Sequence, residues 1–76
     1  MAENKITVYE VICTDAKASF TGKFSFGYFI DEEDAKRELS WRQSQYPDNN
    51  IIIVPEECSQ GRFEYLKEYI RDFKEE

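Results

Sequence analysis

Few residues in this 76-residue chain have the chemistry that catalysis needs, and their spacing does not favour it. The sequence contains no histidine, so neither a Ser-His-Asp triad nor a Cys-His pair can form. Glu56 and Glu57 directly precede Cys58, and neighbouring carboxylates disfavour the reactive thiolate. Residues 21–23 (Thr-Gly-Lys) lack the rest of a phosphate-binding loop. We therefore expect no enzymatic activity.

The acidic and sulfur-containing residues also predict no metal centre and no cofactor. Cys13 and Cys58 have no histidine and no second pair of thiols with which to complete a tetrahedral zinc shell. Residues 31–34 (Asp-Glu-Glu-Asp) lack the spaced oxygen ligands and the turn glycine of a calcium loop. No secretory signal precedes the first apolar segment, so both cysteines are expected to be buried thiols in a reducing, cytoplasmic compartment. A disulfide between them is the alternative.

Trp41 is the residue whose type and spacing most favour a binding site. The helix expected around it has a weak apolar side made by Ala35, Leu39, Arg42 and Tyr46. Trp41 lies roughly 160° around the helix from Leu39, at ~100° per residue. An exposed tryptophan beside arginine is typical of interface anchors, whereas packing on a loop or on the other helix is the alternative. The predicted binding site consists of Trp41, its helical neighbours Arg37, Glu38 and Gln45, and the acidic run Asp31, Glu32, Glu33 and Asp34; Ser44 lies on the same side of the helix.

The net charge limits the class of partner. Sixteen acids against ten bases give a formal charge of −6, which repels the phosphates of nucleic acids and the surface of anionic membranes. The longest apolar run, residues 51–54, is too short to cross a bilayer. A basic protein remains a compatible partner.

These features together favour a binding protein over an enzyme. We expect a non-enzymatic inhibitor or adaptor, of the type that phages and mobile elements encode, that occludes a basic or nucleic-acid-handling protein. A structural homo-oligomer that associates through exposed aromatic side chains is the alternative, and a homodimer is compatible with either.

Three segments have the composition of strands. Residues 5–13 are rich in β-branched and aromatic side chains, and residues 24–30 alternate with period two. Gly27 inside the second segment predicts the close approach of another backbone or a helix. Residues 51–54 form a short apolar run that is expected to be a buried central strand closed by Pro55.

Capping signals predict two helices. Asp31 as N-cap, acids in the first turn and Pro47 after the last turn predict a helix from 32 to about 46. Ser59 is expected to cap a second helix from 60 to about 74, with Cys58 and Phe63 forming a hydrophobic staple. Its apolar face is predicted to consist of Phe63, Leu66, Tyr69, Ile70 and Phe73, and its polar side of Glu64, Glu68, Asp72 and Glu75, interleaved with Lys67, Arg71 and Lys74.

The order of these elements, ββαβα, predicts an α+β fold in a single domain over residues 1–76. The first two strands are expected to form an antiparallel hairpin, and the direction of the third strand is left open. Both helices are expected to cover one face of the three-stranded sheet, with the last helix making the largest contribution to the core.

Overall fold

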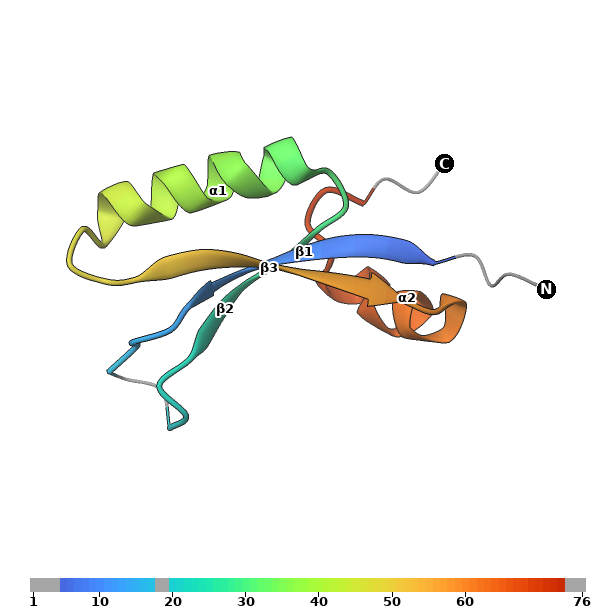
Figure 1. Ribbon diagram of the computed structural model, residues 1–76, viewed down its shortest axis with the longest axis horizontal. Coiled ribbons are helices and arrows are strands. Elements are labelled where there is room, and N and C mark those ends of the chain that lie inside the picture. The colour runs from blue at the N-terminus through green and yellow to red at the C-terminus, as the bar shows by residue number, and fades with distance from the viewer. Residues whose placement is uncertain (1–4, 18–19, 74–76) are drawn as a thin grey trace.

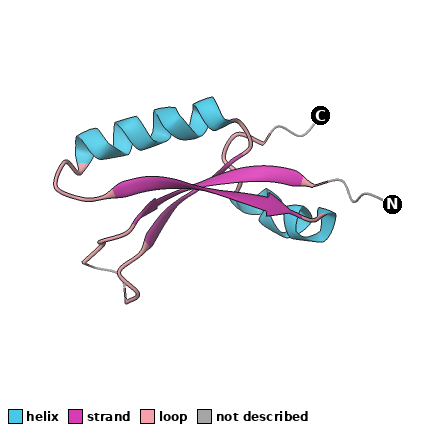
Figure 2. Cartoon of the chain, in the orientation of Figure 1, coloured by secondary structure: helices cyan, strands magenta, loops and turns pink. Residues whose placement is uncertain are grey.

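The computed structural model describes residues 5–17 and 20–73 (Figure 1). Its strands are β1 (Ile6–Cys13), β2 (Phe24–Phe29) and β3 (Ile51–Cys58). Its helices are α1 (Glu32–Gln45) and α2 (Gln60–Leu66), and a 3₁₀ turn (Lys67–Tyr69) follows α2. β1 is antiparallel to both neighbours in a sheet of order β2-β1-β3 (Figure 2). The predicted α+β class and the order ββαβα are confirmed.

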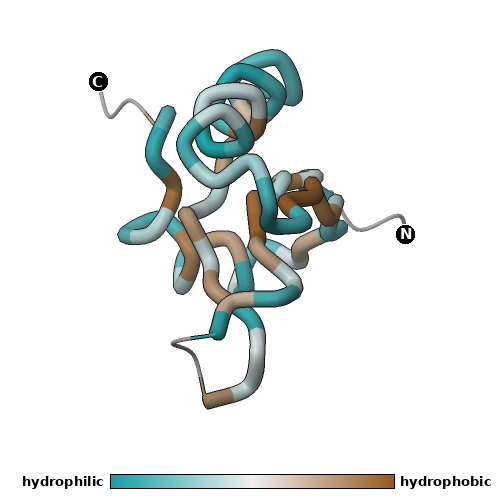
Figure 3. Tube along the Cα trace, turned by 90° about the vertical axis from the view of Figure 1, so that its left-hand side faces the viewer, coloured by the Kyte–Doolittle hydropathy of each residue, from teal (hydrophilic) through white to brown (hydrophobic). Residues whose placement is uncertain are grey.

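The two helices begin where their capping residues predict. The Asp31 side chain accepts a hydrogen bond from the Glu33 N–H (2.9 Å), and the Ser59 hydroxyl accepts one from the Arg62 N–H (3.2 Å). Cys58 and Phe63 lie in one buried cluster, as a hydrophobic staple requires. The α1 helix is mostly hydrophilic (Figure 3), and Ala35 is the one described residue of α1 that is fully buried.

The helices lie on opposite faces of the sheet, so the prediction that both pack on one face is wrong. Paired residues of β1 and β3 share a face, and the faces alternate along each strand. Val11, Cys13 and Ile51 pack with Ala35 of α1, whereas Val8 and Cys58 pack on the other face. There their cluster includes three residues from α2 and the segment after it, namely Phe63, Leu66 and Ile70. The sheet therefore separates two small cores (Figure 1).

β3 differs from its prediction in length and in position. It runs through Pro55 to Cys58, and it is an edge strand because β1 is central. The Thr14 N–H, in register just beyond β1, donates to the Asn50 carbonyl (3.0 Å). In an antiparallel pair of strands only every second pair of opposite residues exchanges hydrogen bonds. Counting from Asn50, the even-numbered residues of β3 therefore bond to β1, and the backbone N of Pro55 points away from β1. An edge strand tolerates proline at such a position, so Pro55 does not end the strand.

β2 carries an irregularity that the alternating pattern did not predict. The register with β1 shifts between Val11 and Ile12, so Phe26 has no partner of its own and the strand bulges there. As a result Phe26 and Phe29 both pack on the α1 side, whereas Tyr28 packs against the core on the α2 side. Gly27 takes a φ of +118°, which a glycine adopts most readily.

The last helix is shorter than predicted. α2 ends at Leu66, and after the 3₁₀ turn the chain becomes extended at Ile70, which bridges to Tyr28 of β2. The Asp72 carboxylate accepts hydrogen bonds from the N–H groups of Ile30 (2.7 Å) and Asp31 (2.9 Å). These bonds explain why Asp72 does not line a helix face. The predicted positions Lys74 and Glu75 lie outside the described residues.

The apolar residues of this segment are buried largely as predicted. Phe63, Leu66 and Ile70 belong to the core on the α2 side, and Phe73 packs against it. Tyr69 is half exposed, because the chain has left the α-helix before it. Arg71 lies over Gly27, where a Cβ would come within 2.7 Å of the Arg71 Cδ atom. The close approach predicted at Gly27 is therefore made by a side chain of the C-terminal segment.

Candidate functional site

Trp41 is exposed and is held against an arginine, which makes it the centre of the candidate site. Its side of α1 points away from the core, and 53% of the residue is accessible to solvent. The guanidinium carbon of Arg42 lies 4.6 Å from the Trp41 ring centroid and also 4.6 Å from that of Phe26. Two cation–π contacts thus hold one arginine against rings from α1 and β2.

Further aromatic rings extend this contact across the surface. Phe26 stacks on Tyr46 with a centroid separation of 6.2 Å and an interplanar angle of 19°, and it meets the edge of Phe24 at 5.1 Å and 73°. Phe24 and Tyr46 are each about half exposed. We call this group the aromatic array; it consists of Phe24, Phe26, Trp41, Arg42 and Tyr46.

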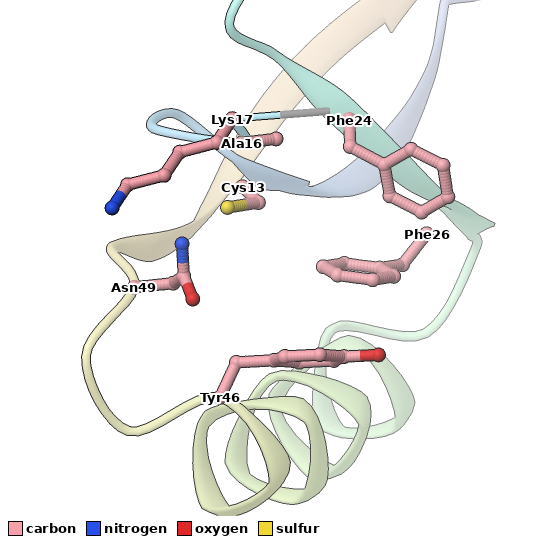
Figure 4. Close-up of a pocket in the computed structure, with 7 residues that line it drawn as sticks. All are labelled: Cys13, Ala16, Lys17, Phe24, Phe26, Tyr46 and Asn49. Atoms are coloured by element: carbon pink, nitrogen blue, oxygen red, sulfur yellow. The ribbon is translucent and has the colours of Figure 1, made fainter. Parts of the chain in front are cut away.

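An apolar pocket of about 360 Å³ opens beside the array. Figure 4 shows the rings of Phe24 and Phe26 on one side of it and the Tyr46 ring below them. Its lining residues are Cys13, Ala16, Lys17, Phe24, Phe26, Tyr46 and Asn49. The volume is at the small end of the range for ligand pockets, and a wall of this kind suits an apolar side chain of a bound protein.

Asp15 organises the polar rim next to this pocket. Its carboxylate accepts hydrogen bonds from the backbone N–H of Asn50 (2.9 Å), the thiol of Cys13 (3.2 Å) and the side-chain amide of Asn49 (3.2 Å). These bonds, the one from Asn50 foremost, lower the pKa of Asp15 below its usual range. The loop after β1 and the turn before β3 are thereby joined at the pocket rim.

Glu38, one of the predicted binding residues, supports the array from behind rather than lying on the free surface. Only 13% of its side chain is exposed, and it forms ion pairs with Arg42 (2.5 Å) and Arg71 (2.8 Å). Burial alone would raise the pKa of Glu38, but the hydrogen bonds from these two arginines outweigh it and lower the pKa. Glu38 therefore positions the guanidinium of Arg42 between the rings.

The other predicted site residues lie on the exposed surface of α1. Arg37 and Gln45 are exposed on the helix, as is Ser44, whose hydroxyl donates to the Trp41 carbonyl. The acidic run Asp31, Glu32, Glu33 and Asp34 forms the cap and first turn of α1. Within it, Asp34 pairs with Arg37 and Glu33 pairs with Lys36. Glu32 is exposed.

The sequence interpretation placed Trp41 in the site but missed its ring partners. Arg42 and Tyr46 were assigned to the apolar side of the helix, and Phe24 and Phe26 to a strand face. The β2 bulge places the Phe26 ring against α1, and the residue spacing of β2 and of α1 gives no indication of this contact. The one available clue was the alternation of two phenylalanines in a strand next to a helix containing tryptophan and arginine.

Both cysteines are free and buried, as predicted, one in each core. Burial and the neighbouring Glu56 raise the pKa of the Cys58 thiol. Over residues 5–17 and 20–73, no three histidine, cysteine, aspartate or glutamate side chains come together as a metal site would require. No helix in the same ranges is long and apolar enough to cross a membrane.

Comparisons with known proteins do not assign the chain to a family. No family model matches it, and neither the curated proteins nor the solved structures include one with significant similarity to it.

Proposed function

We propose that this chain is a non-enzymatic protein-binding module that covers a functional surface of its partner through the aromatic array. The observation that carries the proposal is the pair of stacking contacts holding Arg42 between Trp41 and Phe26 while Trp41 stays half exposed. Tryptophan, tyrosine and arginine are the residues most enriched at the energetic centres of interfaces. Here the neighbouring contacts already order them, which lowers the entropy lost on binding.

The charge of the module favours a basic partner. Residues 31–46 contain five acids against three bases, and the whole chain carries −6. A lysine- or arginine-rich surface would be attracted and oriented by this field, whereas a nucleic acid would be repelled. The module would then act as an inhibitor or adaptor, of the kind that phages and mobile elements encode, on a protein that itself handles nucleic acid. Two free thiols are compatible with action in the cytoplasm.

The proposal is tested by capture from a bacterial lysate followed by titration of the captured protein in purified form. Trp41→Ala is expected to weaken binding by about 2 kcal/mol or more. Tyr65→Ala is the matched control, because Tyr65 is an exposed aromatic residue on α2, on the opposite face of the sheet. Rising salt should slow association by screening exposed charges.

Two results would contradict the proposal. One is a partner that Trp41→Ala binds as tightly as the unaltered chain does. The other is equal loss of binding in Trp41→Ala and Tyr65→Ala, which would show that exposed aromatic area in general, rather than the array, determines binding.

A further inference from the structure

The outer edge of β3 is a second surface, separate from the aromatic array. β2, the other edge strand, is partly covered: the Arg71 N–H donates to the Tyr28 carbonyl (2.8 Å), and Ile70 bridges to the same residue. No residue in the described ranges 5–17 and 20–73 pairs with the outer edge of β3. An apolar strand edge of this kind is a template for another strand.

The backbone of β3 limits where such pairing can occur. Even-numbered residues of β3 direct their hydrogen-bonding groups to β1, so Ile51 and Ile53 direct theirs outward. Pro55 offers no outward N–H. On the other side, the outward groups of Asn49 are already bound: its N–H donates to the Tyr46 carbonyl (3.1 Å), and its carbonyl accepts from the Gln43 side-chain amide (2.7 Å). The pairing window is therefore residues 51–53, inside a run of four apolar residues that carries no charge.

We propose that β3 pairs antiparallel with β3 of a second copy of this chain, about a two-fold axis at Ile52. In this register Ile51 of each copy is opposite Ile53 of the other, and the two pairs exchange four backbone hydrogen bonds. Pro55 lies beyond the window, so its missing N–H costs nothing. The two three-stranded sheets become one sheet of six strands.

The side chains around the axis favour a second copy as the occupant. Ile52 and Val54 are each 37% exposed, on the face of the sheet opposite α1. Pairing brings the two Ile52 side chains together at a non-hydrogen-bonded position, where facing side chains approach most closely. The two residues of the window whose backbone groups point outward are both isoleucine, and the two-fold axis places each of them opposite the other. The short strand is therefore complementary to itself.

The proposed dimer leaves the aromatic array free. Arg42 and Glu38 contact Phe26 and Arg71, so the array lies on the β2 side of α1, at the edge of the sheet away from β3. The inference therefore does not depend on the proposed function, and either can fail without the other.

The register is tested by cysteine cross-linking of the full chain. Ile52→Cys places two thiols across the axis with Cα atoms about 4.5 Å apart, within the range that a disulfide spans. Val54→Cys is the matched control: it has the same exposure on the same face. Its two Cα atoms would be about 14 Å apart, offset by four residues along the paired strands. Mild oxidation should yield a covalent dimer from Ile52→Cys alone, measured by intact mass without reductant.

Sedimentation equilibrium tests the association itself, from about 10 µM to about 1 mM of the unaltered chain. A dimer is expected, and salt should strengthen it, because each copy carries −6. Ile52→Lys should raise the dissociation constant about tenfold or more by placing like charges opposite each other. Thr7→Lys, on an exposed position of β1, should leave it unchanged. A monomer throughout this range, or equal cross-linking of Val54→Cys, would overturn the proposal.

Discussion

Gly27 of β2 is covered by the Arg71 side chain, and its replacement by alanine should destabilise the fold through two separable effects. The residue has a φ of +118°, which side chains rarely adopt, and a new Cβ would lie 2.7 Å from Cδ and 3.0 Å from Cγ of Arg71. The Arg71 side chain cannot remain where it is. It would have to leave its ion pair with Glu38 and its hydrogen bond to the Phe26 carbonyl (3.4 Å).

The size of the effect follows from these contacts. The backbone conformation costs about 1–3 kcal/mol for a residue other than glycine. Displacing Arg71 costs roughly a further 1 kcal/mol, a figure kept low because its side chain is nearly half exposed. The lower entropy of the unfolded chain returns about 0.4–1 kcal/mol. Gly27→Ala should therefore lower the free energy of unfolding by about 1–4 kcal/mol, out of the ~4–11 kcal/mol expected for 76 residues.

Urea unfolding followed by circular dichroism measures this cost in Gly27→Ala, Arg71→Ala and the double variant. Removal of the Arg71 side chain abolishes the clash but not the backbone strain, so the glycine substitution should cost about 1 kcal/mol less in the Arg71→Ala background. Gly61→Ala is the control, because a Cβ there meets nothing within 4 Å. It should be neutral or stabilising by up to ~1 kcal/mol. A cost below about 1 kcal/mol for Gly27→Ala, or an equal cost in both backgrounds, would refute the reasoning.

Three further predictions concern the cores and the titrating groups. Leu66→Ala should cost about 2–5 kcal/mol in urea unfolding, because Leu66 is almost fully buried, whereas exposed Tyr65→Ala on the same helix should change stability by less than ~0.5 kcal/mol; equal costs would contradict the core assignment. Because folding lowers the pKa of Glu38, the ionised side chain stabilises the fold above the ordinary glutamate value of 4.5, and this contribution is lost as pH falls through the folded value. Glu38→Gln should therefore make the free energy of unfolding depend less steeply on pH in the acid range, and an unchanged dependence would count against the ion pairs. Cys13 and Cys58 should react with a maleimide far more slowly in the native protein than in urea, and rapid native labelling of both would show that the cores open readily.

Local chemistry was enough to predict where most elements begin. The N-caps Asp31 and Ser59 and the helix-ending Pro47 act within one turn of backbone, so the start of both helices and the end of α1 follow from neighbouring residues. The same holds for the exposure of Trp41, which depends on its angle from Leu39 around one helix. The two free, buried thiols were likewise predicted.

The wrong predictions concern segments whose backbone groups form bonds with residues far away in the chain. The last helix stops early because Ile70 and Arg71 pair with Tyr28, and Asp72 caps Ile30 and Asp31; no local propensity encodes these bonds. Pro55 does not end β3, because its backbone N points away from β1 and no hydrogen bond between the strands is lost. This orientation can be known only once the register with β1 is known.

The amino-acid sequence by itself determined the identity and order of the elements, the caps of the helices and the outward orientation of Trp41, because each depends on contacts within a few residues. The tertiary structure alone decided that the helices cover opposite faces of the sheet, that β3 forms an edge, and that the bulge at Phe26 brings its ring to Arg42. Period-two alternation shows that a strand has two faces but not which element covers each of them. That choice depends on the pairing of the strands and on where the chain crosses between them, and the candidate site exists because of it.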